Sequence, residues 1–170
     1  MTQNSHQEKS IFQTKAFRQG LSFGVVSSAM TVLGISLGVW SSAGKLRAIV
    51  ASIIGLSISN SLADAFSIYM SDTATGDSKN ALISAAVTAG IEFILPFLFL
   101  LPFLTMKLKS AVILNSIIGI ALVAGTGLYV AKLNKHSDKR TLEDIMLYVG
   151  ITVAIMALTY VGGLIVNKLV

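Results

Sequence analysis

The chain has 170 residues, of which 54% are hydrophobic and only 12% are charged. So few charges exclude an ordinary soluble domain and leave enough apolar residues for several membrane spans. There is no cysteine, which excludes disulfides, thiolate metal ligands and cysteine nucleophiles. The net charge of +5 would suggest nucleic acid in a soluble protein, but the basic residues flank the apolar runs, so we predict no nucleic-acid partner.

Five apolar runs follow one another, each near or above the ~20 residues that a helix needs to cross the ~30 Å core of a bilayer. They are 19–41, 46–71, 80–104, 111–133 and 145–166. Spans of this length must be helical, because lipid offers no partner for unpaired backbone. We therefore predict an all-α polytopic membrane protein whose transmembrane domain, 19–170, holds five transmembrane helices in the lipid bilayer.

The residues before the first run, 1–18, are predicted to form a cytoplasmic tail. They contain no apolar core after a basic start, so we expect no cleavable signal peptide. Residues 10–18 mix Ile11, Phe12 and Phe17 with Lys15 and Arg18. This mixture fits an amphipathic turn at the interface and a solvated basic tail equally well.

Lysine and arginine are unequally divided between the two sides of the predicted bundle. The side of the N-terminus carries eight: Lys9, Lys15, Arg18, Lys79, Lys132, Lys135, Lys139 and Arg140. The other side carries five: Lys45, Arg47, Lys107, Lys109 and Lys168. Because cytoplasmic segments are enriched in basic residues, we predict a cytoplasmic N-terminus and a C-terminus on the opposite side.

The first run has small residues at four-residue spacing, at Gly20, Gly24 and Ser28 and again at Gly34 and Gly38. Such spacing allows a neighbouring helix to approach closely, so we predict a packing role. The run also carries hydroxyl side chains, which we expect to bond back to carbonyls of their own helix. They are Ser22, Ser27, Ser28 and Thr31.

The second run contains a carboxylate, Asp64, within an otherwise apolar stretch. An aspartate at the centre of a span costs roughly 2.5–3.5 kcal/mol, so it usually faces the bundle interior and marks an ion or proton pathway. At ~100° per residue, other polar side chains fall within about 60° of it. They are Ser57, Asn60, Ser61, Ser67 and Ser71, and they predict a polar stripe on one face.

The third run places Ser84, Thr88 and Glu92 four residues apart on one face. Pro96 follows one turn later and has no N–H to donate to the carbonyl of Glu92. A free carbonyl beside a carboxylate is a good pair of oxygen ligands, although proline kinks also occur without any ligand. We predict ion or proton duty for Glu92.

The rest of the chain is expected to serve packing and topology. The fourth and fifth runs are rich in small residues and contain no central charge. The charged segment 134–142 reads as a solvated loop, with an N-cap for the fifth helix at Thr141. His6 and His136 lie outside the spans and far apart, so we predict no histidine metal site.

Motifs of soluble enzymes are missing from the sequence: there is no Walker A loop, dinucleotide glycine signature, HExxH or Gly-x-Ser-x-Gly. A membrane enzyme acting on lipid head groups would need several clustered acids and basic residues at membrane depth. The spans offer Asp64 and Glu92 alone. We therefore predict that the protein is not an enzyme and holds no resident cofactor.

Two inward carboxylates suit the handling of cations. Divalent cations take oxygen ligands, and we predict metal ligands at Asp64, Glu92, Asn60, Ser61 and Ser67. Proton and metal compete for the same carboxyl oxygens, so Asp64 and Glu92 are also predicted to couple metal movement to proton movement. The number and type of acids do not name the metal.

Four segments resemble the vacuolar iron transporter family, which carries ferrous iron and manganese into vacuoles. They are Phe23–Gly34, the Asn60-x3-Asp64-Ala65 pattern, Tyr69-Met70-Ser71 and the closing Leu158–Gly163. The likeness covers nearly the whole chain. It implies a five-helix fold, a homodimer and antiport of a divalent metal ion, iron or manganese, against protons.

Departures from that family bear on transport. Its plant-type members have a first-helix aspartate where this chain has Phe23, and a second-helix methionine where this chain has Asp64. They also carry a cytoplasmic metal-binding domain, reduced here to a loop at 72–79. The leading hypothesis is a metal/proton antiporter. The alternative is a non-transporting dimeric membrane scaffold or assembly protein, in which the acids pair with Asn or Ser to hold helices together.

Overall fold

The computed structural model describes residues 11–76 and 78–169, and all regular structure in that part of the chain is helical. After a 3-10 turn at Ile11–Gln13 come five helices: α1 Lys15–Ser42, α2 Leu46–Ala74, α3 Ser78–Thr105, α4 Leu108–Leu133 and α5 Asp138–Leu169. All five are long and apolar enough to cross a membrane. Each predicted run lies inside one of them, which confirms the all-α polytopic class.

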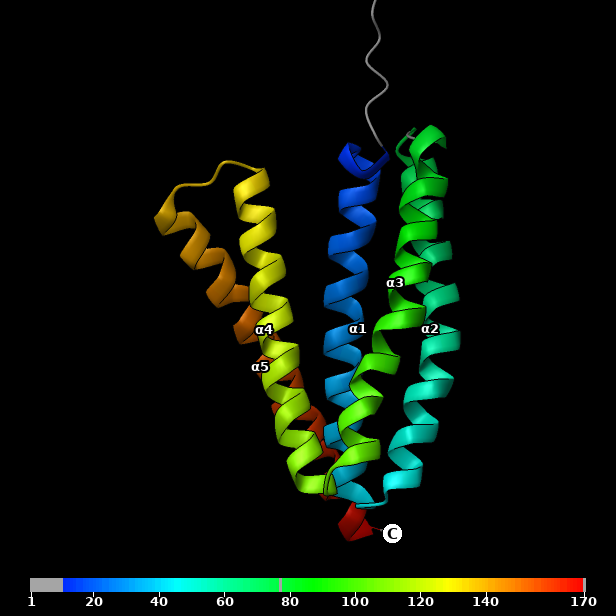
Figure 1. Cartoon of the computed structure of the whole chain (residues 1–170), viewed down its shortest axis with the longest axis vertical. Coiled ribbons are helices and arrows are strands. Elements are labelled where there is room, and N and C mark those ends of the chain that lie inside the picture. Colours follow the sequence, from blue (N-terminus) through cyan, green and yellow to red (C-terminus); the bar gives the residue numbers. More distant parts are fainter. Residues whose placement is uncertain (1–10, 77, 170) are drawn as a thin grey trace, which may run out of the picture.

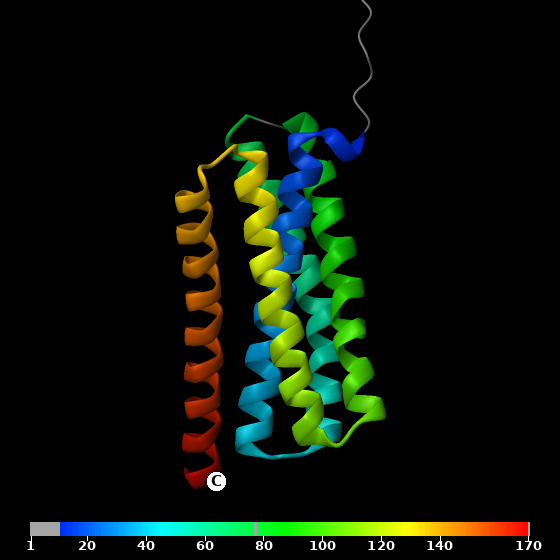
Figure 2. The ribbon, with the colours of Figure 1, turned by 60° about the vertical axis from the view of Figure 1, so that its left-hand side comes forward.

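The predicted tail, 1–18, overlaps the start of the first helix. Its residues 1–10 lie outside the described part of the chain, and α1 already begins at Lys15. The Thr14 hydroxyl caps this helix by accepting a hydrogen bond from the Phe17 backbone N–H at 3.2 Å. Ile11 and Phe12 are exposed in the turn that lies across the end of α1 in Figure 2. Exposed apolar residues at the end of a span favour the interfacial alternative.

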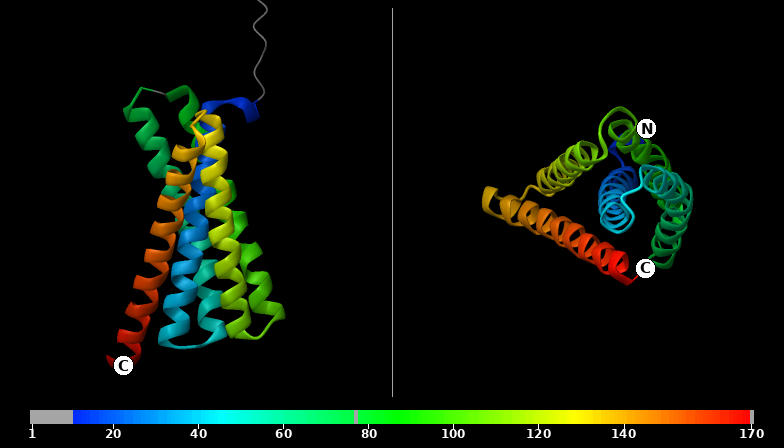
Figure 3. Two further views of the ribbon diagram at one scale, coloured as in Figure 1. Left: turned by 90° about the vertical axis from the view of Figure 1, so that its left-hand side faces the viewer. Right: turned by 90° about the horizontal axis from the view of Figure 1, so that it is seen from below.

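Helix α1 is the central element of the bundle and packs against all four other long helices. Figure 3 shows it enclosed when the bundle is viewed along its length. Its N-terminal half meets α3, where a Cβ atom on Gly24 would lie 2.9 Å from Ile91 Cβ. Its C-terminal half meets α5, where a Cβ atom on Gly34 would lie 3.4 Å from Thr159 Cγ2. The predicted packing role of the small residues is confirmed, with a different neighbour for each half.

Helix α5 lies on the outside of the bundle and packs against α1 and α4 (Figure 1). Thr152 and Gly163 are its only fully buried residues in the described range. Most of its large apolar side chains are exposed, among them Leu158 and Ile165. An apolar outer surface of this kind matches lipid chains.

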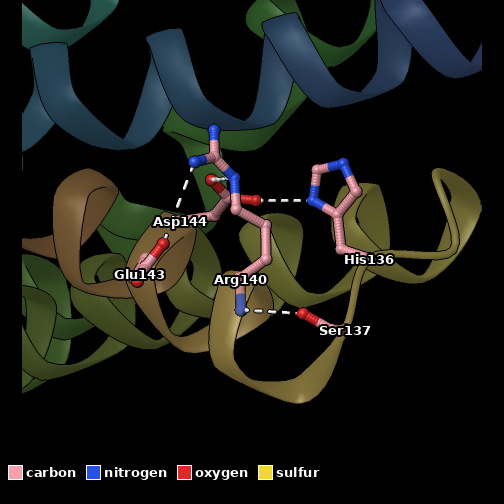
Figure 4. Close-up of polar contacts among 5 residues, drawn as sticks. All are labelled: His136, Ser137, Arg140, Glu143 and Asp144. Atoms are coloured by element: carbon pink, nitrogen blue, oxygen red, sulfur yellow. Dashed lines mark hydrogen bonds and ion pairs between the residues drawn. The ribbon is translucent and has the colours of Figure 1, made fainter.

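The connection between α4 and α5 is held by charged side chains (Figure 4). Asp144 lies between two partners, with its Oδ2 2.7 Å from His136 Nδ1 and its Oδ1 3.4 Å from Arg140 Nε. The predicted N-cap at Thr141 is wrong, because α5 already begins at Asp138. The Ser137 hydroxyl takes the capping role by accepting from the Arg140 N–H at 3.4 Å. The charged segment is therefore largely the first turns of a helix.

The close approach of α1 and α3 generates a stability prediction. A Cβ atom on Gly20 would lie 2.5 Å from the Ser84 carbonyl oxygen and 2.9 Å from Val87 Cβ. We expect Gly20→Ala to destabilise the protein by about 1–3 kcal/mol, because the backbone oxygen cannot move aside. Thermal unfolding in detergent, followed by circular dichroism, measures the loss.

The matched control is Gly90→Ala in α3, where an added Cβ atom meets nothing within 4 Å. Its unfolding temperature should stay the same or rise, since alanine favours a helix more than glycine. Equal losses for the two variants would contradict the steric explanation.

Candidate functional site

The inner polar cluster lies where α1, α2 and α3 meet, and consists of Ser27, Asn60, Asp64 and Glu92. The Asn60 side-chain nitrogen Nδ2 lies 3.1 Å from Asp64 Oδ2 and 3.4 Å from Glu92 Oε2. The Ser27 hydroxyl donates to the same Asp64 Oδ2 at 2.9 Å, and Nδ2 lies 3.4 Å from the Ser27 oxygen. One amide thus joins the carboxyl groups of two helices, and Ser27 ties in the third.

Glu92 is the most enclosed member of the inner cluster. Its side chain is 1% exposed, and its second carboxyl oxygen, Oε1, is buried without a hydrogen-bond partner among the described residues. The backbone adds another acceptor, because α3 continues through Pro96, which has no N–H for the Glu92 carbonyl. A buried oxygen without a partner is costly, so this position has capacity for a proton or a cation.

Two of the predicted ligands lie outside this cluster. The Ser67 side chain is exposed and its hydroxyl donates to the Ala63 carbonyl at 2.8 Å. Ser61 is buried, but its hydroxyl donates to the Ile58 carbonyl at 3.1 Å. Both hydroxyls are occupied by their own helix, a common use of serine inside a span. The structure brings together Asp64, Glu92 and Asn60 and leaves Ser61 and Ser67 apart.

An outer polar cluster, formed by Gln19, Asp72 and Ser84, lies nearer the end of the same three helices. Gln19 Nε2 donates to Asp72 Oδ1 at 3.0 Å, and the buried Ser84 hydroxyl donates to Asp72 Oδ2. The sequence predicts that Asp72 lies in the loop after the second span. Helix α2 instead continues to Ala74, so the Asp72 carboxylate reaches its neighbours from the last turn.

The inner and outer clusters are separated by the same number of residues on each of the three helices. Gln19 and Ser27, Asp64 and Asp72, and Ser84 and Glu92 are each eight residues apart. Eight residues are close to two full turns, so the pairs share a face and are separated by roughly 12 Å along each helix. Ile68, which is 8% exposed, and the fully buried Thr88 lie midway. Phe23 lies midway on α1.

Sequence reasoning missed three of these residues. Ser27 was expected to bond to its own helix, but its hydroxyl donates to Asp64 on α2. Gln19 is predicted as the first residue of its span and Asp72 as the first residue of a loop, yet they bond to each other. The signal that would have found them is the shared eight-residue spacing, because it repeats on three separate helices.

The chemical character of the inner cluster is a pair of carboxyl groups with one amide and one hydroxyl. In the described part of the chain, no three His, Cys, Asp or Glu side chains gather to form a metal site. Its oxygens nevertheless suit a hard or borderline cation that keeps part of its water shell. Basic residues at membrane depth are absent from the spans, so nothing there neutralises the two acids permanently.

Comparison with protein-family models, with curated proteins and with solved structures finds no match to this chain. The resemblance to the vacuolar iron transporter family stays a prediction that rests on the four segments quoted above.

The bridging role of Asn60 can be tested by removing its amide. Asn60→Ala takes a donor away from both Asp64 and Glu92 and leaves buried acceptors without a partner, so we expect a loss of about 1–3 kcal/mol in stability. Ser67→Ala is the control, because its exposed hydroxyl bonds only within α2. Thermal unfolding of both variants in one detergent gives the comparison. An Asn60→Ala protein as stable as Ser67→Ala would refute the bridge.

Proposed function

We propose that the protein transports a divalent transition-metal ion, Fe²⁺ or Mn²⁺, across a membrane in exchange for protons. The observation that carries this proposal is the convergence of Asp64 and Glu92 on one amide inside a five-helix bundle. Ionisable residues at such depth are rare and usually mark substrate or proton pathways. The resemblance to vacuolar iron transporters supports the choice of metals.

The geometry suggests how the inner cluster exchanges its occupants. Two negative charges close together in an apolar bundle are unfavourable unless a proton or a cation lies between them. While the amide nitrogen of Asn60 faces both acids, a proton shared by Asp64 and Glu92 removes the repulsion between the two carboxylates. Rotation of the amide by half a turn would offer its oxygen instead, giving a cation ligands from Asp64, Glu92 and Asn60. Loading of the metal would therefore release protons, which is the basis of antiport.

Topology and assembly belong to the same proposal. The basic residues favour a cytoplasmic N-terminus, which puts the outer cluster on the cytoplasmic side. Asp64 and Asn60 are only partly buried by this chain, although they lie in a span. A second copy covering them would shield the charge from lipid, which agrees with the homodimer implied by the family resemblance.

The alternative is a dimeric scaffold without transport, and one observation favours it. Asp64 Oδ2 already accepts hydrogen bonds from Ser27 and Asn60, which connects α1 to α2 and satisfies that oxygen. In that case the acids would serve only to hold helices together. The unpartnered Glu92 Oε1 is what a purely structural cluster leaves unexplained.

Transport assays separate these functions. In proteoliposomes with an imposed pH gradient, we expect the native protein to take up Fe²⁺ or Mn²⁺ while protons move in the opposite direction. Both fluxes should fall at least ~100-fold in Asp64→Asn and in Glu92→Gln, because an amide side chain neither ionises nor takes up and releases a proton. Internal metal and internal pH are read together.

Ser67→Ala should transport at the native rate in the same assay, since its hydroxyl lies outside the inner cluster. Folding is checked by gel filtration and thermal unfolding of each variant. Native flux in folded Asp64→Asn would reject the proposed site. Absence of flux from the native protein for both metals and both gradient directions would favour the scaffold.

The outer cluster is proposed as the first contact for the metal on its way to Asp64 and Glu92. Asp72→Asn should then raise the metal concentration needed for half-maximal flux about tenfold, while the maximal rate changes little, because attraction at the mouth acts on capture. Asp138→Asn is the control, an exposed acid at the same end of the bundle on α5. Equal effects of the two substitutions would indicate a general surface-charge effect.

A further inference from the structure

A cavity of about 650 Å³ lies between the start of α1 and the end of α4. Lys15, Arg18, Gln19 and Ser22 line it from α1, and Leu133 and Asn134 from α4. Figure 1 shows the two helices diverging toward this end. The cavity therefore lies at the end of the bundle where α1 starts and α4 ends.

A second, smaller cavity of about 280 Å³ lies further along the same two helices, toward the middle of the bundle. It is lined by Leu21 and Val25 of α1 and by Leu122, Gly125 and Tyr129 of α4. Ser22 belongs to both cavities and marks the junction between them. A basic chamber thus leads into an apolar groove.

The charge of the upper cavity is uncompensated in the described structure. None of its lining residues is acidic, and neither Lys15 nor Arg18 forms an ion pair with any residue between 11 and 169 that the structure describes. Both cations also lie in the first turn of α1, where the helix dipole is positive and basic side chains are unfavourable. The helix itself gains nothing from them, whereas a bound anion would gain from the dipole and from both charges.

We propose that these two cavities together bind one anionic phospholipid. Lys15 and Arg18 hold its phosphate, the hydroxyl of Ser22 lies at the level of the glycerol, and one acyl chain occupies the groove beside Gly125. Gln19 lines the cavity and also bonds to Asp72, so the lipid site adjoins the outer cluster. Lipid binding by the two cavities does not depend on the proposed transport function. Basic pockets between transmembrane helices are known to select anionic head groups.

The first test compares lipids on the purified full-length protein in detergent. Native mass spectrometry and thermal unfolding are measured with added phosphatidylglycerol or phosphatidylcholine. We expect retention of one phosphatidylglycerol and stabilisation by it alone. In Lys15→Gln/Arg18→Gln, phosphatidylglycerol binding should weaken by at least ~10-fold. The lipid-free double variant should be as stable as the native protein, because the removed charges oppose the helix dipole.

The matched control, Lys107→Gln/Lys109→Gln, removes two exposed charges at the other end of the bundle and should bind phosphatidylglycerol as the native protein does. Equal binding of the two lipids, or equal loss in both double variants, would overturn the proposal. Inorganic phosphate is tested as well. Stabilisation by phosphate as large as that by phosphatidylglycerol would overturn the lipid assignment.

The groove is tested separately by filling it. An added Cβ atom on Gly125 meets nothing within 4 Å, so Gly125→Leu should fold and place its side chain in the acyl-chain groove. We expect it to lose phosphatidylglycerol retention while keeping both basic residues. Gly55→Leu, an equally open and exposed position on α2, should retain the lipid. Unchanged retention in Gly125→Leu would show that the groove holds no acyl chain.

Discussion

The amide of Asn60 is the contact on which the arrangement of the first three helices depends. It brings the carboxyl groups of Asp64 and Glu92 together in a medium that offers them no water. Such a pair is unfavourable without a donor, and a donor without acceptors would be equally unfavourable. These hydrogen bonds form only when α1, α2 and α3 adopt one mutual register, which gives specificity to helices whose surfaces are mostly apolar.

The glycines of α1 make this register possible. Side-chain hydrogen bonds of about 3 Å require backbones that approach closely, and Gly20 and Gly24 remove the side chains that would separate α1 from α3. The eight-residue spacing then repeats the polar contact after two turns. Packing and polar pairing are consequently one pattern: small residues set the distance, and the helical period sets which polar groups meet.

Much of the fold was predictable, because span length and apolar composition determine helices in a bilayer almost alone. The face shared by Ser84, Thr88 and Glu92 was predictable as well, because it follows from the helical period within one helix. The partners of Ser27 and Asp72 were not, because a hydroxyl can bond to its own carbonyl or across to a neighbour. Only the relative placement of helices decides between those choices, and it also separated Ser61 and Ser67 from the cluster that Asn60 joins.

The short connection between α2 and α3 has a consequence for biosynthesis. Helix α3 begins at Ser78, directly after α2 ends at Ala74, so the two spans leave the insertion machinery as a hairpin. Asp64 and Glu92 lie on the two arms of that hairpin and share a donor on one of them. Both acids and their shared donor belong to this hairpin, so their contact needs neither α4 nor α5. Insertion of α2 and α3 as one unit would therefore bring each acid into lipid with a donor already beside it.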